Sequence, residues 1–501
     1  DVPAGNFSSL AASADRLYLL EQGDSANELK TIDFGPDQPS LETFASGVSF
    51  FELSADRSRM LYASADDAMY IVDASAKAPG DVGPHQVRIG DWRLPVRPAE
   101  EWRQMFADAW RMQRDFLFDP QLRGQDWEAI RARYAPLAER IGDRRELDDL
   151  LAQMVAELGV LHSQVYGGDY PEEPESGAPA FLGAELEVVE EGLRVARIYR
   201  TDPELPSERS PLARPGVNLV AGDVITAVNG RPVGSQAELA LQLNYQAGQQ
   251  VRLDYRRGRD EGSAIVEPVS AWEDWGLRYQ DWIKSRRVAV DELADGRIGY
   301  LHLNAMGSND IATFAREFYA NIDRQGLIID VRRNRGGSID SWVIEKLLRR
   351  AWMFWQAPTG EPFWNQQQTF RGHLAVLVDP LTYSDGETFS AGVKTLGLGP
   401  VIGQRTAGAG VWLSNNNRLV DRGLMRAAQL PQFDAEGRWL VEGFGVEPDI
   451  QVSNLPHATW NGQDAQLERA VEVLLERLEA EPVVQPDAQP IPARGENGVS
   501  P

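Results

Sequence analysis

The stretch from residue 373 to residue 396 has a strand–turn–helix pattern that restricts the possible folds more than any other part of the sequence. Residues 375–378 form an apolar run with the length of a buried strand, Asp379-Pro380 ends it, and residues 387–396 have helical character. The same plan occurs earlier, where the apolar run 327–329 is followed by the Gly336-Gly337 turn and a further helical segment. Repeated units of this kind predict an α/β domain that binds its ligands at the carboxyl ends of the strands.

Ser384 lies at the sharp turn between this strand and its helix. A serine in such a turn is exposed at the positive end of a helix, where N–H groups without partners can stabilise a developing oxyanion. The position therefore suits a nucleophile. Serine is also a common cap of helix starts, so both interpretations stay open from this motif alone.

Composition removes several classes of site and partner. The 501 residues predict about three domains, and a net charge of −25 argues against nucleic acid or an anionic membrane as a partner. The chain has no cysteine, and its five histidines have no paired spacing, so neither a thiolate nor a metal site is expected. No run is long enough to span a membrane. Because the chain begins at Asp1, its natural start is expected to be missing.

The first part of the chain divides into a β-rich and a helical region. Residues 1–85 alternate short strand patterns with Gly, Asp and Ser turns in the rhythm of β-propeller blades, in too few units to close a ring. Residues 98–175 predict a helical domain with an aromatic stripe from Trp102 to Phe116. His162 follows its last helix in a loop that leads into two glycines, where it is a candidate general base or an ordinary buried histidine.

Residues 178–270 contain GDVITAVNG, with an Asn-Gly hairpin turn between two strands, and a short helix over residues 236–243. This segment resembles a PDZ domain. The resemblance implies that Phe181, Leu182 and Gly183 form the loop that binds a peptide carboxylate beside an edge strand. The alternative is that the unit only packs and its groove is blocked.

Residues 271–480 predict the α/β catalytic domain, which ends in a helix over residues 464–478, and residues 481–501 predict a disordered tail. The whole order resembles the tricorn protease family of serine peptidases, which is related to the C-terminal processing peptidases. The most specific pieces are EWRQMFADAWRMQRDFLFDP, LTYSDGETF and VEGFGVEPDI. The expected fold class is multidomain: a β-propeller remnant, a helical domain, a PDZ domain and a crotonase-like α/β domain.

The resemblance implies a role for each site residue. Ser384 would be the nucleophile and His162 the general base. The N–H of Asp385, with Gly336 or Gly337, would form the oxyanion hole. Glu442 would orient the imidazole through an intervening hydroxyl, an arrangement that fits the chemistry of an activated serine.

Two departures from the family pattern affect this assignment. Ala409 stands where Ser-Lys relatives have their lysine base, which favours His162 as the base. Leu161 stands where tricorn proteins have a serine that relays the hydrogen bond of the glutamate, and the adjacent Ser163 is expected to point elsewhere.

The resemblance implies a tricorn-like serine endopeptidase, or a hydrolase that trims short peptides, which acts through an acyl-enzyme without cofactor or metal. The alternatives are a peptide-binding pseudoenzyme that uses its PDZ and propeller surfaces, and an acyl-CoA enzyme on a crotonase-like core, for which no partner motif is found. The family resemblance implies a homo-oligomer, a hexamer, in the cytoplasm, and the missing start leaves a periplasmic location open.

Overall fold

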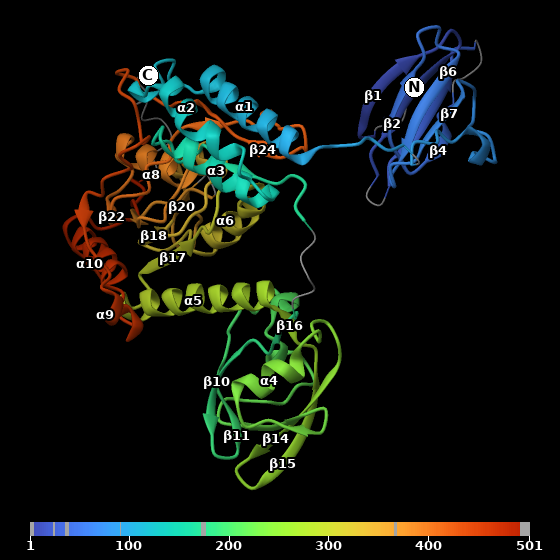
Figure 1. Ribbon diagram of the computed structural model, residues 1–501. Helices are drawn as coiled ribbons and strands as arrows, with labels where there is room; N and C mark the ends of the chain where they lie inside the picture. The colour runs from blue at the N-terminus through green and yellow to red at the C-terminus, as the bar shows by residue number, and fades with distance from the viewer. Residues whose placement is uncertain are drawn as a thin grey trace. The chain divides into compact units, whose positions relative to one another are not determined.

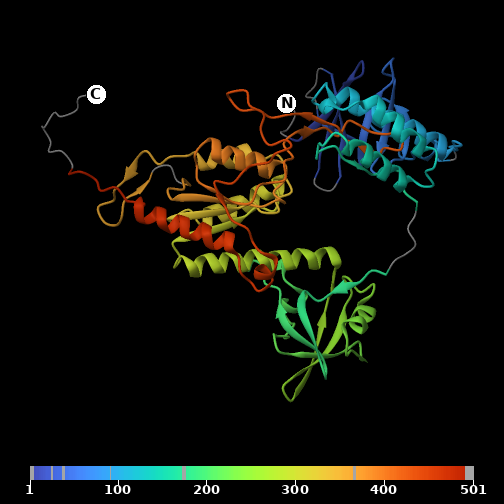
Figure 2. The same cartoon turned by 60° about the vertical axis from the view of Figure 1, so that its left-hand side comes forward.

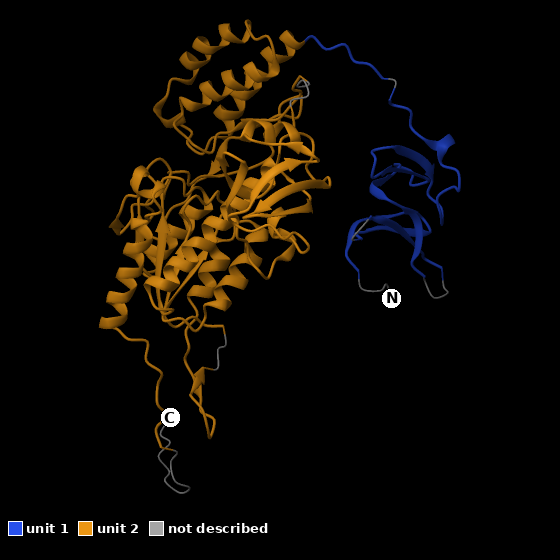
Figure 3. Cartoon of the chain, turned by 90° about the horizontal axis from the view of Figure 1, so that it is seen from below, with its two compact units in different colours: residues 1–97 blue, residues 98–501 orange. Residues whose placement is uncertain are grey.

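The computed structural model describes residues 5–490 apart from 24–25, 36–39, 91, 172–176 and 365–367. It divides into two compact units, Asp1–Arg97 and Pro98–Pro501 (Figure 3). Residues 491–501 of the predicted tail and residues 172–175 of the predicted helical domain lie outside the described part. Within that part, no helix is both long and apolar enough to cross a membrane.

The first unit consists of two antiparallel sheets of consecutive strands, the arrangement expected of propeller blades. One sheet has four strands and the other has three. The described strands of this unit do not close into a ring. Its core is built from inward-facing side chains such as Tyr18, Leu29 and Met60, each 0% exposed. The strands are β1 (Phe7–Ala12), β2 (Arg16–Glu21), β3 (Glu28–Asp33), β4 (Glu42–Ser46), β5 (Val48–Leu53), β6 (Arg59–Ser64) and β7 (Met69–Asp73).

The second unit begins with three packed helices, α1 (Pro98–Phe116), α2 (Trp127–Ala138) and α3 (Arg144–Ala156). Asp126 and Asp143 cap α2 and α3 through their side chains, as expected of acidic residues before helices. Most of the predicted aromatic stripe is buried, whereas Phe116 at the end of α1 is 49% exposed. The core of the helices also includes Val411 and Met425, which come from segments far along the sequence.

The following β-rich part has the sheet order β10-β11-β12-β14-β15, so β10 is an edge strand beside α4 (Figure 1). Its interior contains Leu193, Ile225 and Leu253, all fully buried. The elements are β9 (Ala180–Phe181), β10 (Ala184–Val189), β11 (Gly192–Ile198), β12 (Val224–Val228), β13 (Arg231–Pro232), α4 (Gln236–Leu243), β14 (Val251–Arg257), β15 (Asp260–Val266) and β16 (Val269–Ser270).

The long helix α5 (Ala271–Leu293) joins this part to a parallel sheet with the order β17-β18-β21-β22-β26 (Figures 1 and 2). Helices α5 and α10 pack on one face of the sheet, while α6, α7 and α8 pack on the other. Both faces are therefore buried, which explains the apolar runs in the strands. The strands are β17 (Ile298–His302), β18 (Gly326–Asp330), β21 (His373–Val378), β22 (Val401–Gly403) and β26 (Ile450–Gln451).

The remaining helices of the described α/β part are α6 (Ser308–Ala320), α7 (Asp340–Leu347), α8 (Asp385–Thr395), α9 (Pro456–Trp460) and α10 (Ala465–Ala480). Short pairs flank the sheet: β19 (Phe354–Trp355) with β20 (Phe363–Trp364), and β23 (Trp412–Leu413) with β25 (Ala428–Leu430). The start of the predicted tail contacts this domain, since Arg371 donates to the Val484 carbonyl at 2.6 Å.

Candidate active site

Ser384 stands at the carboxyl end of β21 and immediately before α8, in a backbone conformation that is unusual for serine. Its φ is 54° and its ψ is −120°. Gly336 lies directly against it: a Cβ on Gly336 would be 2.4 Å from Ser384 Cβ and 2.9 Å from Oγ. Only glycine leaves room for the serine here, and the strained turn aims the hydroxyl at the GG loop.

The two glycines differ in what their N–H groups can do. The Gly336 N–H donates to Asn334 Oδ1 at 2.8 Å, and the Gly336 carbonyl accepts from Met306 N–H at 2.8 Å. Within the described residues, neither the Gly337 N–H nor the Asp385 N–H has a hydrogen-bond acceptor. Of the predicted oxyanion donors, Asp385 and Gly337 are therefore available in this structure, while Gly336 is engaged.

The Asp385 carboxylate ties the nucleophile turn to the GG loop. Its Oδ2 accepts from Ile339 N–H at 2.8 Å and from Asp340 N–H at 3.1 Å, at the start of α7. Burial raises the pKa of Asp385 to about 7, with a further contribution from the neighbouring Asp340 carboxyl. Ser384 and the loop that carries Gly337 are thus held by one buried side chain.

Glu387 fixes the other side of the same turn. It is fully buried, and it accepts from Ser384 N–H at 3.1 Å, Gly408 N–H at 2.6 Å and Ala409 N–H at 2.7 Å. The Thr406 hydroxyl also donates to it at 2.5 Å. Burial raises the pKa of Glu387, and the four donors oppose this shift. Ala409, at the position of the lysine in Ser-Lys relatives, contributes its N–H to this network.

His162 reaches the site from the helical domain because its loop pairs with a distant strand. The short β8 (Val165–Tyr166) forms an antiparallel pair with β24 (Leu424–Met425). The buried Arg144 side chain also connects the β8 and β24 segments, since it donates to Asp421 at 2.5 Å and to the Gly167 carbonyl at 3.1 Å. These contacts connect segments more than 200 residues apart in the sequence.

The His162 imidazole packs against the residue that precedes the nucleophile. The rings of His162 and Tyr383 are 4.9 Å apart in an edge-to-face arrangement, and the Tyr383 hydroxyl donates to the Leu161 carbonyl at 3.0 Å. Among the hydrogen bonds of the described residues, none joins the His162 ring to the Ser384 hydroxyl. The structure thus brings the two segments together without closing the bond between base and nucleophile.

The environment of His162 keeps its imidazole neutral. The residue is 4% exposed, and burial lowers its pKa to about 4, against a smaller opposing effect of a hydrogen bond to the Val411 backbone. Nδ1 is buried without a partner in the described part of the chain. A neutral imidazole with a free nitrogen can accept a proton.

Glu442 lies one loop away from His162 and does not bond to it. Its Oε2 accepts from Gly410 N–H at 2.9 Å and Val411 N–H at 3.0 Å, while Oε1 is buried without a partner among the described residues. Burial raises the pKa of Glu442. The preceding Val441 has a φ of 65°, a strained value for a β-branched residue.

No intervening hydroxyl joins Glu442 to His162 in the described residues. Leu161 is 50% exposed, and the Ser163 hydroxyl lies 3.5 Å from Gln113 Oε1. Glu442 instead bonds to the N–H of Val411, the residue whose backbone also contacts the imidazole. The predicted orienting role of Glu442 stays a prediction.

The predicted carboxylate loop lies between β9 and β10. Gly183 has a φ of 67°, and its carbonyl accepts from the Ser210 hydroxyl at 2.8 Å. Phe181 and Leu182 line a cavity of about 370 Å³ between edge strand β10 and α4, which ends at Asp274 and Arg278 of α5. The groove of this unit is therefore open.

Three residues of the site were not predicted from the sequence: Asn334, Tyr383 and Glu387. Glu387 had a usable signal, because Ser384-x-x-Glu387 has the spacing of a capping box. Asn334 and Tyr383 gain their roles only from tertiary contacts. Within the described ranges, no group of three or more His, Asp or Glu residues could hold a metal ion.

Comparison with known proteins agrees with this architecture. Residues 297–452 match peptidase family S41, residues 98–156 match the tricorn protease C1 domain, and residues 180–271 match the tricorn protease PDZ domain. "Tricorn protease homolog 1" of Streptomyces coelicolor is 36% identical over 98% of this chain and 47% of its own length. The "Putative Tricorn-like protease C-terminal subunit" of Sulfurisphaera tokodaii is 32% identical over 91% of this chain and 53% of its own length.

The crystal structure of the tricorn protease superposes with a TM-score of 0.86 at 24% identity, over 96% of this chain and 47% of that chain. This match confirms the expected fold class. The chain spans about half the length of the relatives it matches. Its sequence and domain order show that the chain belongs to the tricorn protease family, with a peptidase family S41 domain over residues 297–452.

Proposed function

We propose that this chain is a serine peptidase that cleaves short peptides, with Ser384 as nucleophile and His162 as general base. The observation that carries the proposal is the Ser384 turn itself: a strained serine at a helix start, packed on Gly336, with the N–H groups of Asp385 and Gly337 unbonded beside it in the described structure. Such donors stabilise the negative charge that develops on an attacked carbonyl oxygen.

The reaction follows from these groups. Ser384 Oγ attacks the peptide carbonyl while the imidazole takes its proton, and the tetrahedral oxyanion is held by the two N–H groups. The imidazolium then protonates the leaving amine, which departs and leaves an ester on Ser384. Water, deprotonated by the same imidazole, attacks the ester, and the acid product and the serine hydroxyl are released.

His162 must approach Ser384 for the first proton transfer. The imidazole packs on Tyr383, the neighbour of Ser384, and in this proposal a movement of the His162 loop closes the hydrogen bond to the Ser384 hydroxyl. Hydrogen bonds between catalytic groups are often long without substrate. We assign Glu442 a positioning role, through the Val411 peptide that both Glu442 and the imidazole contact.

The PDZ part has the features of a peptide-binding module. A peptide can add a strand to β10 and place its carboxylate at the Phe181-Leu182-Gly183 loop, in the cavity that ends at Arg278. In this proposal the groove captures peptides by their C-termini and raises their concentration near Ser384.

A fluorophosphonate probe tests the catalytic assignment. We expect the purified chain to be labelled at Ser384, with loss of labelling in Ser384→Ala and strongly slowed labelling in His162→Gln. Ser390→Ala, on the same helix and hydrogen-bonded to the Gly386 carbonyl at 2.7 Å, is the matched serine control. A peptide-binding pseudoenzyme would leave Ser384 unlabelled at every probe concentration.

Assembly and location also belong to this proposal. By resemblance to the family, the chain forms a homo-oligomer, a hexamer, and acts in the cytoplasm. Light scattering of the purified protein measures the mass of the assembly directly. A monomer at micromolar concentration contradicts the hexamer.

A further inference from the structure

Helix α5 carries a stack of aromatic rings that the proposed chemistry does not use. Consecutive rings of Trp272, Trp275, Tyr279 and Trp282 lie 5.5, 5.5 and 5.6 Å apart. The stack begins in solvent, with Trp272 70% and Trp275 45% exposed, and it ends against the buried His302 ring. Two exposed tryptophans in register on one helix form an apolar surface that a folded chain normally covers or uses.

Two arginines from the GG loop lie on this stack. The Arg335 guanidinium is 5.9 Å from the Trp275 ring centre, and the Arg333 guanidinium is 5.6 Å from that of Trp282. Both residues are exposed, and neither has a carboxylate partner among the described ion pairs. The preceding Arg332 differs, since it is buried and paired with Asp330 at 2.7 Å and Asp464 at 2.8 Å.

These unpaired charges are notable in a chain with a net charge of −25. A guanidinium that stacks on an aromatic ring keeps its hydrogen-bonding edge free to bind a carboxylate. Arg333 and Arg335 are therefore held by the rings and remain available to an acidic ligand.

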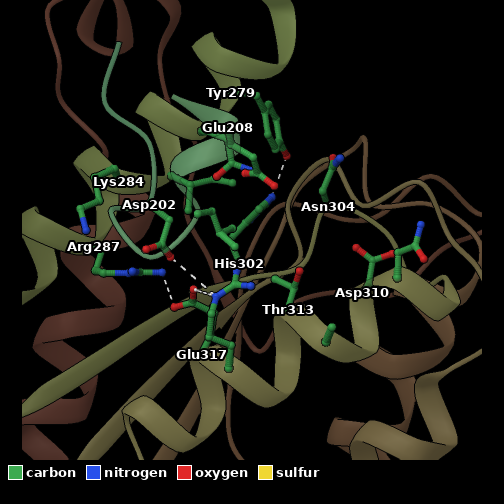
Figure 4. A pocket seen from close by; sticks show the side chains of 16 residues that line it. Asp202, Glu208, Tyr279, Lys284, Arg287, His302, Asn304, Asp310, Thr313 and Glu317 are labelled. Carbon is green, nitrogen blue, oxygen red and sulfur yellow. Dashed lines mark hydrogen bonds and ion pairs between the residues drawn. The ribbon is translucent and has the colours of Figure 1, made fainter. Parts of the chain in front are cut away.

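The arginines lie next to the catalytic turn. Arg335 directly precedes Gly336, which packs on Ser384. The Arg335 N–H donates to the Asn304 carbonyl at 3.0 Å, and Asn304 and Tyr279 line a cavity of about 380 Å³ (Figure 4). Arg335 therefore links the stack, through Trp275, with the cavity, through Asn304, and with the Gly336 turn.

We propose that Trp272, Trp275, Arg333 and Arg335 form a docking surface for an extended substrate peptide that carries a carboxylate. The carboxylate binds Arg333 and Arg335, and apolar side chains of the same peptide pack on Trp275 and Trp272. From Trp272 to Trp282 the helix rises about 15 Å, which an extended peptide covers with about five residues. The carboxylate is an acidic side chain or the C-terminus of the peptide. This inference rests on the proposed function, since it names the substrate class of the same site.

Binding to the Ser384→Ala variant tests the inference without cleavage. The probe is a fluorescein-labelled decapeptide with Trp and Glu in its central part, compared with the same peptide with Gln for Glu and with its C-terminal amide. Fluorescence polarisation gives Kd. We expect Trp275→Ala and Arg335→Gln, each in the Ser384→Ala background, to weaken binding about threefold to thirtyfold. Trp272→Ala and Arg333→Gln are expected to act in the same direction.

Matched controls separate this surface from the rest of the chain. The control residues are Trp460, 88% exposed on α9, and Arg259, exposed after β14. Among the described contacts, Trp460 has no arginine on its ring and Arg259 has no aromatic ring beside it. Trp460→Ala and Arg259→Gln should therefore not change Kd. Arg278→Gln measures the separate contribution of the PDZ groove. Circular dichroism of each variant checks that it is folded.

The peptide series identifies the carboxylate. If Gln for Glu removes the effect of Arg335→Gln, the ligand is a side chain, and if amidation removes it, the ligand is the C-terminus. Unchanged Kd in folded Trp275→Ala and Arg335→Gln variants overturns the inference. Fluorophosphonate labelling of Ser384 is independent of this result, so loss of the docking surface and loss of the proposed peptidase activity are distinguishable.

Discussion

The two halves of the candidate site differ in how their buried polar groups are bonded. The nucleophile half comes from β21, α8 and the GG loop. Its Glu387 carboxylate accepts four hydrogen bonds, whereas Asp385 accepts two at Oδ2, from the start of α7, and its Oδ1 has no partner among the described residues. The base half combines segments from two ends of the second unit, and it leaves His162 Nδ1 and Glu442 Oε1 without partners among the described residues.

This difference indicates that the two halves have different roles in the proposed reaction. The saturated Glu387 network holds the Ser384 turn in place before substrate binds, which costs no reorganisation during the reaction. Buried polar atoms without partners are expensive, so they persist where a second arrangement satisfies them. We infer that the His162 loop adjusts when substrate binds, while the Glu387 network keeps the Ser384 turn fixed.

The largest expected effect is that of removing the nucleophile. Ser384→Ala should lower kcat by a factor on the order of 10⁴ or more, because the acyl-enzyme cannot form. Thermal unfolding should change little, since the Glu387 contact is made by the backbone N–H of residue 384. Steady-state hydrolysis of a fluorogenic peptide, with mass spectrometry to detect the acyl adduct, measures both steps. Unchanged peptide cleavage by Ser384→Ala would place the chemistry elsewhere.

Next in size is the loss of the Glu387 hydrogen bonds. Glu387→Gln replaces one acceptor oxygen with an NH₂ group that faces N–H donors, so we expect a loss of about 3 kcal/mol in unfolding free energy together with loss of activity. Chemical denaturation followed by tryptophan fluorescence measures the first quantity. Glu468→Gln, exposed on the first turn of α10, is the matched control and should cost well under 1 kcal/mol. If the two variants have equal stability, the nucleophile half is not held by Glu387.

The local structure of the nucleophile half was predictable from the sequence, whereas the tertiary contacts that form the base half were not. Local rules set the Ser384 turn: an apolar run, a break and a helix start within about 20 residues. Helix α4 was predicted with its observed bounds, residues 236–243. The helix predicted over residues 464–478 corresponds to α10, Ala465–Ala480, where Leu467, Ala470, Val471, Leu474 and Leu478 are buried.

The position of His162 depends on pairings that no local pattern encodes. β8 has two residues, and its partner β24 lies more than 250 positions later. The Arg144–Asp421 bond likewise joins residues 277 positions apart. The family resemblance selected His162 among five histidines, whereas the route that brings it to Ser384 required the structure.

A smaller effect is expected from Glu442. Glu442→Gln keeps the size of the side chain and one acceptor for Gly410 and Val411, so it should leave the fold intact and lower kcat about tenfold to a hundredfold by misplacing the imidazole. KM should change much less than kcat if Glu442 positions the base without touching substrate. Glu436→Gln, exposed in the nearby turn, is the control. Equal kcat values in both variants would remove Glu442 from the site.

The smallest effect is a pH dependence that separates the two halves. His162, with a pKa of about 4, must be neutral to act as base, so kcat/KM should fall below about pH 4 and stay high above it. Burial raises the pKa of Asp385 to about 7, so the folded protein binds this proton more tightly than the unfolded chain. The stabilisation from Asp385 is therefore complete below its unfolded pKa of 3.8 and disappears as pH rises through about 7.

The Asp385→Asn variant isolates the pH-dependent stabilisation from Asp385, because asparagine resembles the protonated acid. It can still accept from Ile339 and Asp340 N–H, and its NH₂ group can donate to the Asp340 carboxylate. His162 shifts stability in the opposite direction, since its lowered pKa makes the fold lose stability as pH falls from 6.5 to about 4. That contribution is the same in both proteins and cancels in their difference.

The measurement is the Tm of Asp385→Asn minus the Tm of the parent chain. We expect this difference to be about 2–4 °C more positive at pH 8.5 than at pH 5.5, because only the parent loses the stabilisation from protonated Asp385. Asp487→Asn, exposed beyond α10, should follow the parent curve at every pH. A constant difference would mean that Asp385 is already ionised in the folded protein. The nucleophile half would then depend on a buried, charged carboxylate beside Asp340, and removal of the Asp340 charge would become the more stabilising change.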